Sequence, residues 1–284
     1  MAPAYHPRMS TLRSLQDNLG EIGLSGARSL IGSSLGWSTS WWHVVKVGAL
    51  ILVLALSPST YDRANRSALA RHVVLGTAPI LLGFSLLSAL ASVVIIRIVV
   101  VTAVSYGLTQ YALEMVVRVH VLELIPLGAA LFVALRGTVP SGAELLRMQR
   151  RGEFDTLLRA GLDPLRHEVM PRVVAGIFAV LMLAAVTCLI AMLLAYVSVY
   201  GFTLGAFAGF TRTLGRIFEP GVAMIFALKT LFFSLAVALV PVAALLRGQR
   251  PAAGVRISPE LESLVRLFAA ILLIELASLV GNYS

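Results

Sequence analysis

The chain has few charged residues and a single cysteine, and both shortages restrict the classes of protein to which it can belong. Of its 284 residues only 13% are charged and 58% are hydrophobic, whereas about a quarter of the residues in a soluble domain are charged. Because Cys188 is the single cysteine, neither an intramolecular disulfide nor a cysteine metal cluster can form, and it lies inside an apolar run. The first 20 residues contain no apolar h-region, and we expect no cleavable signal peptide. Water is therefore not the main solvent of this protein.

The motifs of common nucleotide-binding and hydrolytic enzymes are missing as well. Because no GxxxxGK[ST] phosphate loop is present, the chain cannot bind and hydrolyse ATP by that route. The pair His167-Glu168 begins like the zinc-protease motif HExxH, but the fifth residue is Pro171. No GxSxG nucleophile elbow occurs either. We therefore expect no catalytic residue, no metal site and no cofactor bound by this chain.

Long apolar runs are the main feature that the sequence does have. A helix needs about 20 residues to cross the hydrocarbon core of a bilayer. Five runs reach this length, at residues 72–103, 112–135, 173–199, 221–246 and 264–280. The run near Trp41 and Trp42 has an apolar core of only ten residues, 47–56, which favours a helix in the membrane interface. The sequence thus predicts an all-α integral membrane protein with an interfacial helix and five transmembrane helices.

The charges predict how the chain is oriented and divided. Arginines gather before the first span, between the second and third, and between the fourth and fifth, whereas the opposite loops hold only Arg212 and Arg216. The positive-inside rule then places the N-terminus in the cytoplasm and the C-terminus in the periplasm. The same rule accounts for the net charge of +9, so we expect no nucleic-acid partner. The predicted parts are a polar segment at 1–36, the interfacial helix and linker at 37–72, and the transmembrane domain at 73–284.

Ionisable residues inside the spans are costly there and are the natural functional candidates. Glu114 and Arg118 are four residues apart, which permits an ion pair on one helix face. Glu123 has no opposite charge at helical spacing, and both Glu123 and Lys229 fall in the outer half of the membrane. Glu123, Lys229 and Arg118 are candidates for a pocket that offers polar groups to a lipid headgroup. A purely structural link between helices is the alternative for Glu123 and Lys229.

Four stretches share a pattern with known proteins. They are "LELIPLGAALFVALR" at 122–136, "GAELLRM" at 142–148, "EFDTLLRAGLDPLRHEVMPRVVAGI" at 153–177 and "ALKTLFFS" at 227–234. In this order and spacing they resemble the MlaE/YrbE family, the permease subunits of MCE-type lipid-transporting ABC transporters. The resemblance covers about residues 40–284. The chain departs from the family at residues 135–140, where members usually carry a glycine-rich stretch.

The resemblance implies a function and a set of partners. The function is to move phospholipids or related lipids between the bacterial inner membrane and a periplasmic MCE-domain protein. The implied partners are a second permease subunit, expected to be an identical copy, and two P-loop ATPase subunits that bind ATP and Mg. A small STAS-domain protein accompanies some systems. Glu123 and Lys229 match positions in the family's periplasm-facing polar pocket.

The charged stretch between the second and third spans is similar to the family's coupling helix, which the ATPase receives. It is predicted at about residues 150–163, and the residues expected to contact the ATPase are Glu153, Phe154, Asp155, Leu157, Leu158, Gly161 and Asp163. The apolar residues recur at spacings of three and four, as in an amphipathic helix. Gly161 is placed to end that helix, and Pro164 to delay the next one.

Three other interpretations remain open at this point. The charged stretch is also typical of an ordinary cytoplasmic loop helix. Glu123 and Lys229 would equally suit the proton or ion path of a secondary transporter or channel. A structural anchor for a periplasmic complex is the third alternative.

Overall fold

The computed structural model describes residues 46, 48–51, 53, 63–108, 111–243 and 259–283. All of these except Lys46 belong to one unit, Val47–Ser284. The predicted polar segment at 1–36 lies outside the described residues, as does most of the predicted interfacial helix and linker at 37–72. The predicted cytoplasmic loop between the fourth and fifth spans also lies largely outside them.

Every element in the described part of the chain is a helix, and five helices are long and apolar enough to cross a membrane. The five spans are Thr77–Ser105, Ala112–Arg150, Leu165–Tyr200, Pro220–Ala243 and Leu261–Asn282. This confirms the predicted all-α membrane fold and its five spans. The second and third spans are longer than predicted, because the helices continue beyond the apolar runs into the charged stretch between them.

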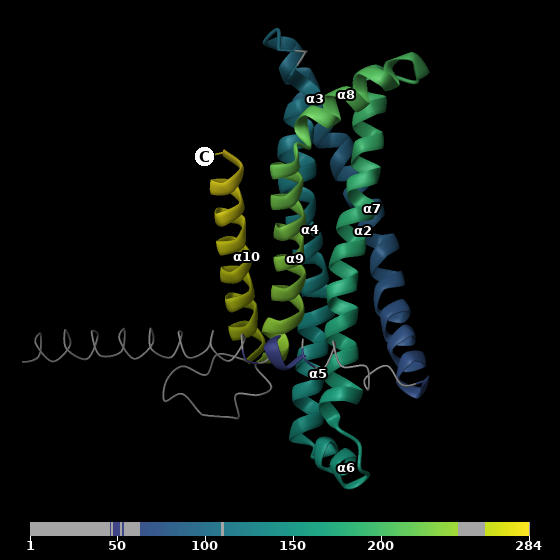
Figure 1. The fold of residues 1–284 in the computed structure, drawn as a ribbon, viewed down its shortest axis with the longest axis vertical. Helices are drawn as coiled ribbons and strands as arrows, with labels where there is room; N and C mark the ends of the chain where they lie inside the picture. The colour runs from purple at the N-terminus through teal and green to yellow at the C-terminus, as the bar shows by residue number, and fades with distance from the viewer. Residues whose placement is uncertain are drawn as a thin grey trace, which may run out of the picture. The chain divides into compact units, whose positions relative to one another are not determined.

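The elements follow one another along the chain with short connections. The first span lies in α2 (Arg63–Ser105), and the second is built from α3 (Ala112–Met115), η3 (Val116–Leu124), α4 (Ile125–Val133), η4 (Ala134–Thr138) and α5 (Val139–Arg150). The rest comprises α6 (Glu153–Arg159), η5 (Leu165–Val169), α7 (Met170–Tyr200), η6 (Leu204–Ala206), α8 (Phe207–Ile217), α9 (Pro220–Ala243) and α10 (Pro259–Tyr283). In Figure 1, α6 lies at one end of the bundle, and α3 and α8 lie at the other.

The segments η3, η4 and η5 are π-helical, and each leads directly into a proline. The N–H groups of Ile125, Val139 and Met170 bond to carbonyls five residues earlier instead of four. Each of these residues precedes a proline, which lacks an N–H and clashes with the carbonyl four residues before it. A wider turn before the proline relieves that clash. The second span therefore continues through Pro126 and Pro140, where the sequence had predicted its end at residue 135.

The second span is the most buried of the five and forms the centre of the bundle. Its segment α4 contacts α2, α7 and α9; α2 packs on α7, α7 on α9, and α9 on α10. One close approach is at Gly142 of α5, where an added Cβ would lie 2.9 Å from the Cβ of Pro241. Only glycine permits α5 and α9 to lie this close together.

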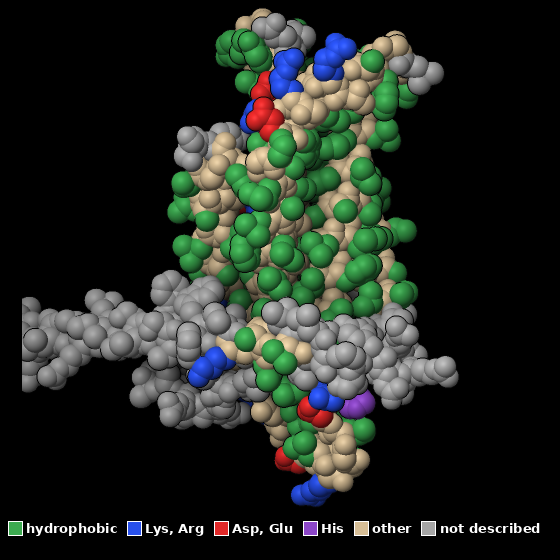
Figure 2. All heavy atoms as spheres, viewed as in Figure 1, with side chains coloured by type: hydrophobic (Ala, Val, Ile, Leu, Met, Phe, Trp, Pro, Cys, Tyr) green, Lys and Arg blue, Asp and Glu red, His purple; other side chains and the backbone are tan. Residues whose placement is uncertain are grey.

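The outer surface of the bundle is apolar along the spans. On α2, Leu82, Leu86 and Leu90 are all more than 60% exposed, and on α10 Val265, Leu272 and Leu276 are 58–62% exposed. Figure 2 shows hydrophobic side chains over this region and charged side chains at the two ends. Such a surface is suited to contact with lipid or with another apolar surface rather than with water.

Candidate functional site

Three charged side chains from three different helices meet inside the membrane domain. Lys229 of α9 has a side chain only 1% exposed, and its Nζ donates a short hydrogen bond to Oε2 of Glu123 in η3. The same Nζ lies 2.8 Å from Oε2 of Glu275 in α10, as an ion pair without the alignment of a hydrogen bond. Asn282 of α10 donates to the other carboxylate oxygen of Glu123 at 3.3 Å. One buried ammonium group is therefore ion-paired with two carboxylates.

Pro126 leaves a main-chain carbonyl free to contact Lys229. It has no N–H to offer the carbonyl of Leu122, four residues earlier. That carbonyl lies 3.5 Å from Nζ of Lys229. The lysine thus contacts a main-chain oxygen left available by the proline as well as the two carboxylates.

The neighbouring residues of η3 make polar contacts with the other helices. His120 is 3% exposed, and its Nε2 lies 2.8 Å from Oγ of Ser92 in α2. Ser92 in turn donates to the carbonyl of Ser88, so its oxygen accepts the proton of Nε2. The thiol of Cys188 in α7 donates to the carbonyl of Val121 at 3.7 Å. Four consecutive residues, 120–123, therefore connect η3 to α2, α7, α9 and α10.

Arg118, the third predicted pocket residue, is bonded to a different partner from those in this charge cluster. Its Nε bonds to Oε1 of Glu114 at 2.9 Å, and each side chain is 35% exposed. This is the ion pair that the spacing of four permits. The structure thus brings Glu123 and Lys229 together and pairs Arg118 with Glu114 instead.

At the opposite end, α6 and its flanking turns form an elbow between α5 and α7. Gly152, with φ +73°, turns the chain after α5, and α6 begins at Glu153. At its other end Gly161 has φ +76°, its N–H bonds to the carbonyl of Leu158, and that of Leu162 bonds to Leu157. This pair of bonds is a Schellman motif, which a left-handed glycine makes possible. The predicted helix end at Gly161 is therefore confirmed.

Asp163 and Pro164 start the next helix at once. The side chain of Asp163 accepts a hydrogen bond from the N–H of Leu165 at 3.0 Å, as an N-cap does. Pro164 is the first helical residue after it, a position where its missing N–H costs nothing. The prediction that Pro164 delays the next helix was wrong, because proline at this position favours helix initiation.

The predicted contact residues of the elbow face outward. No residue of α6 is buried. Leu158 is 59% and Leu162 41% exposed, Phe154 and Leu157 are half-buried, and Asp155 is exposed. Glu153 lies 3.8 Å from Arg151 in a solvent-exposed ion pair. The elbow therefore offers a small apolar surface bordered by charges.

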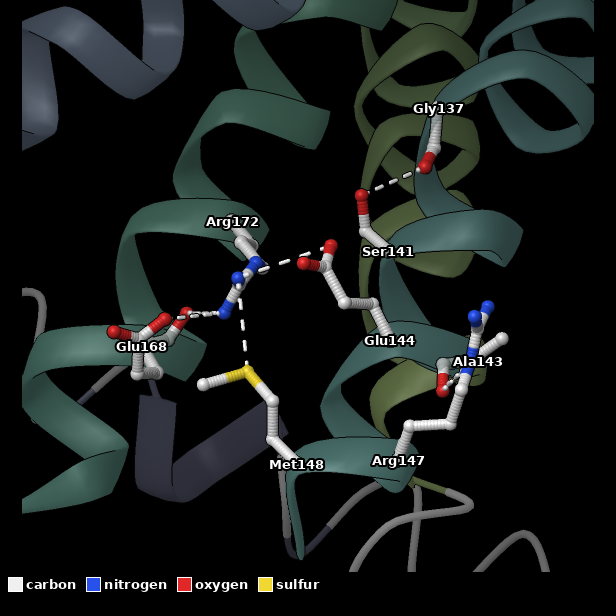
Figure 3. A network of polar contacts seen from close by, with 8 residues as sticks. All are labelled: Gly137, Ser141, Ala143, Glu144, Arg147, Met148, Glu168 and Arg172. Carbon is white, nitrogen blue, oxygen red and sulfur yellow. Dashed lines mark hydrogen bonds and ion pairs between the residues drawn. The ribbon is translucent and has the colours of Figure 1, made fainter. Parts of the chain in front are cut away.

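Arg172 links α5, which leads into the elbow, to the helix that follows the elbow. Its guanidinium bonds to Glu168 at 2.6 Å within its own helix and lies 3.9 Å from a carboxylate oxygen of Glu144 in α5. The sulfur of Met148 accepts a further long contact at 3.9 Å. Figure 3 shows the guanidinium between the side chains of Glu144 and Met148 in α5 and that of Glu168 in η5. The Arg172 side chain is only 14% exposed, whereas Glu168 is 27% and Glu144 61% exposed, so the bond to Glu168 is the better shielded of the two.

Sequence reasoning missed Glu275, Asn282 and His120. Glu275 lies inside the fifth predicted span, so the rule that singled out Glu123 applied to it equally. The partnership of Asn282 with Glu123 carries no sequence signal, since the two are far apart along the chain. His120 is an ionisable residue in the second span and could also have been found by that rule.

The function of this arrangement can be narrowed from its side chains and from comparison of the chain with known proteins. Among the described residues no group of three or more His, Cys, Asp or Glu side chains could hold a metal ion. No curated protein matches the chain. The family model of the permease MlaE matches residues 69–280, which include the first four spans, nearly all of the fifth, the elbow, and Glu123, Lys229 and Glu275 of the buried charge cluster. The chain therefore belongs to the MlaE permease family.

Proposed function

We propose that this protein is the membrane subunit of an ABC transporter that moves phospholipids or related lipids between the bacterial inner membrane and a periplasmic MCE-domain partner. Membership of the permease family and the five apolar spans support a multi-pass membrane transport subunit rather than a catalytic enzyme. In this proposal a P-loop ATPase, which binds ATP and Mg, supplies the energy. A second copy of the permease and, in some assemblies, a STAS-domain protein complete the complex.

The observation that carries the proposal is the elbow. Leu158 and Leu162 are exposed next to charged residues at a site outside the spans, an arrangement suited to contact with a protein partner. The left-handed glycines at both ends of α6 and the N-cap at Asp163 fix its direction relative to α5 and α7. A rigid, partly apolar helix joined to two spans is suited to transmit a movement of the ATPase to those spans. The proposal places this end in the cytoplasm, as the arginine distribution predicts.

The buried charge cluster supports a transport pathway in the outer half of the membrane. Its ionisable groups are costly at this depth, and such groups usually border a ligand or ion path. We assign Glu123 and Lys229 to the wall of the lipid cavity. When the cavity opens, Lys229 is suited to bind a lipid phosphate, and the carboxylates a headgroup ammonium.

The test is to purify the complex gently and to follow ATPase binding and lipid transfer in proteoliposomes. Leu158→Asp combined with Asp155→Lys should release the ATPase while the spans stay folded. Phe202→Asp, a similar change at the α8 end, should leave the ATPase bound, because Phe202 is 90% exposed and far from α6 along the chain.

Two outcomes would contradict the proposal. Transport driven by an ion gradient, with the chain alone in liposomes, would show a secondary transporter. ATP-dependent transport that survives loss of the elbow surface would show that α6 does not couple the two subunits.

A further inference from the structure

The helix α8 has one face bound to the bundle and one face that is basic and open. Phe210 and Ile217 are buried, and Phe210 packs edge-to-face against Tyr196 of α7 with ring centroids 5.1 Å apart. On the other side Arg212 and Arg216 are exposed and four residues apart, so their side chains leave the same face of the helix. Figure 2 shows basic side chains at this end of the molecule.

These two arginines lack an acidic partner within the described part of the chain. The nearby carboxylate of Glu114 is already bound to Arg118 at 2.9 Å. Glu219, in the turn after α8, is exposed and makes no ion pair with either arginine. Two guanidinium groups on adjacent turns repel each other unless an anion lies between them. The face therefore has positive charge that the described protein does not neutralise.

The surroundings of the arginines are open and partly apolar. Gly209 and Gly215 of α8 have free space where a Cβ would be, so a ligand can approach the main chain closely. Phe202, in the turn before α8, is 90% exposed, and Phe207, the first residue of α8, is 58% exposed. An exposed phenylalanine forgoes a large hydrophobic gain in water. Exposed aromatic side chains at the end of a membrane bundle are typical of the headgroup level of a bilayer.

We propose that Arg212 and Arg216 bind the phosphate of an anionic phospholipid in the leaflet around α8. Guanidinium groups bind phosphate oxygens in bidentate fashion, and two of them on one face can enclose a single phosphate. An anionic headgroup is favoured over a zwitterionic one because it brings no positive charge of its own. The positive-inside rule disfavours arginines at this end, and a bound anion offsets that preference. This site is separate from the cavity wall assigned to Glu123 and Lys229.

The experiment uses the full-length chain in nanodiscs of equal parts phosphatidylglycerol and phosphatidylcholine. Bound lipid is counted by native mass spectrometry after release into detergent. Each juxtamembrane arginine strengthens binding to an anionic surface by about fivefold. Arg212→Gln with Arg216→Gln should therefore lower phosphatidylglycerol retention by more than tenfold and leave phosphatidylcholine unchanged. The double lysine variant should restore part of the retention, because it keeps the charge but loses the bidentate geometry.

The matched control is Arg151→Gln with Arg159→Gln, which removes two exposed arginines from the elbow. This control should keep the wild-type retention of phosphatidylglycerol. Equal retention in the α8 variant and the wild type would overturn the proposal. So would equal loss in the α8 variant and the control, because net charge alone would then govern binding. Co-purification of an acidic protein with the wild type, with no preference for phosphatidylglycerol, would assign the face to a protein partner instead and also overturn it.

Discussion

Removing the ammonium of Lys229 should destabilise the protein more than any other single charge deletion in the spans. The side chain is 1% exposed and contacts two carboxylates that are 10% and 15% exposed. Lys229→Met leaves both of them buried without their cation. Breaking a buried ion pair by removing one partner costs about 3–5 kcal/mol. On the scale of globular domains this lowers the melting midpoint by roughly 6–20 °C.

The assay is the loss of monodisperse protein in detergent as temperature rises, at one fixed heating rate. Glu275→Gln should change the midpoint little, because Glu123 still balances Lys229. Adding Glu123→Gln and Glu275→Gln to Lys229→Met should recover most of the loss, since no uncompensated charge then remains. Arg97→Met removes an exposed cation from α2 and serves as the control. If the triple variant melts no higher than Lys229→Met alone, charge balance is not what the lysine provides.

Three further changes test the helix contacts and the elbow. Gly142→Ala would place a Cβ 2.9 Å from that of Pro241, which should cost about 1–3 kcal/mol in thermal unfolding. Gly83→Ala meets no atom within 4 Å and should be neutral or stabilising by up to about 1 kcal/mol, so equal effects would refute the close-packing argument. Gly161→Ala forces a side chain into a left-handed conformation at a cost of about 1–2 kcal/mol. Hydrogen exchange of the elbow amides should then rise about tenfold, and unchanged protection would contradict the Schellman assignment. Arg172→Met should leave ATP hydrolysis intact but reduce lipid transfer several-fold, whereas loss of both would indicate a role in folding only.

The parts of the fold that could be predicted are those governed by local pattern. The number of spans followed from apolar length, and the bounds of α6 from its glycine and its apolar spacing. The pairing of Lys229 with Glu275 could not be predicted, because one sequence does not tell which helices are neighbours in space. Periodicity also missed α8, whose polar face is made of glycine, threonine and two arginines rather than a long charged stripe.

The π-helical segments were beyond the sequence rules for another reason. The second span was predicted to end at residue 135, but the helix continues through Pro126 and Pro140, each of which stands in the first turn after a wide π-helical turn that accommodates the ring. With α-helical geometry, at about 100° per residue, the sequence predicts that Glu114 and Glu123 point to opposite faces of the helix. In η3 that geometry does not apply, so the relation between Glu114 and Glu123 along the helix could not be fixed in advance.

A π-helical turn holds one residue more than an α-helical turn, and this makes η3 a place where the second span can rotate. Returning η3 to α-helical hydrogen bonding would turn one half of the span against the other by about 100° and shift it by about 1.5 Å. Most of the main chain would stay hydrogen-bonded, as lipid requires, but the carbonyl of Leu122 would face Pro126, which has no N–H to donate. Residues 120–123 would exchange their neighbours in one step, and Glu123 would leave Lys229. Distances between spin labels on either side of η3, measured with and without ATP turnover, would remain constant if no such step occurs.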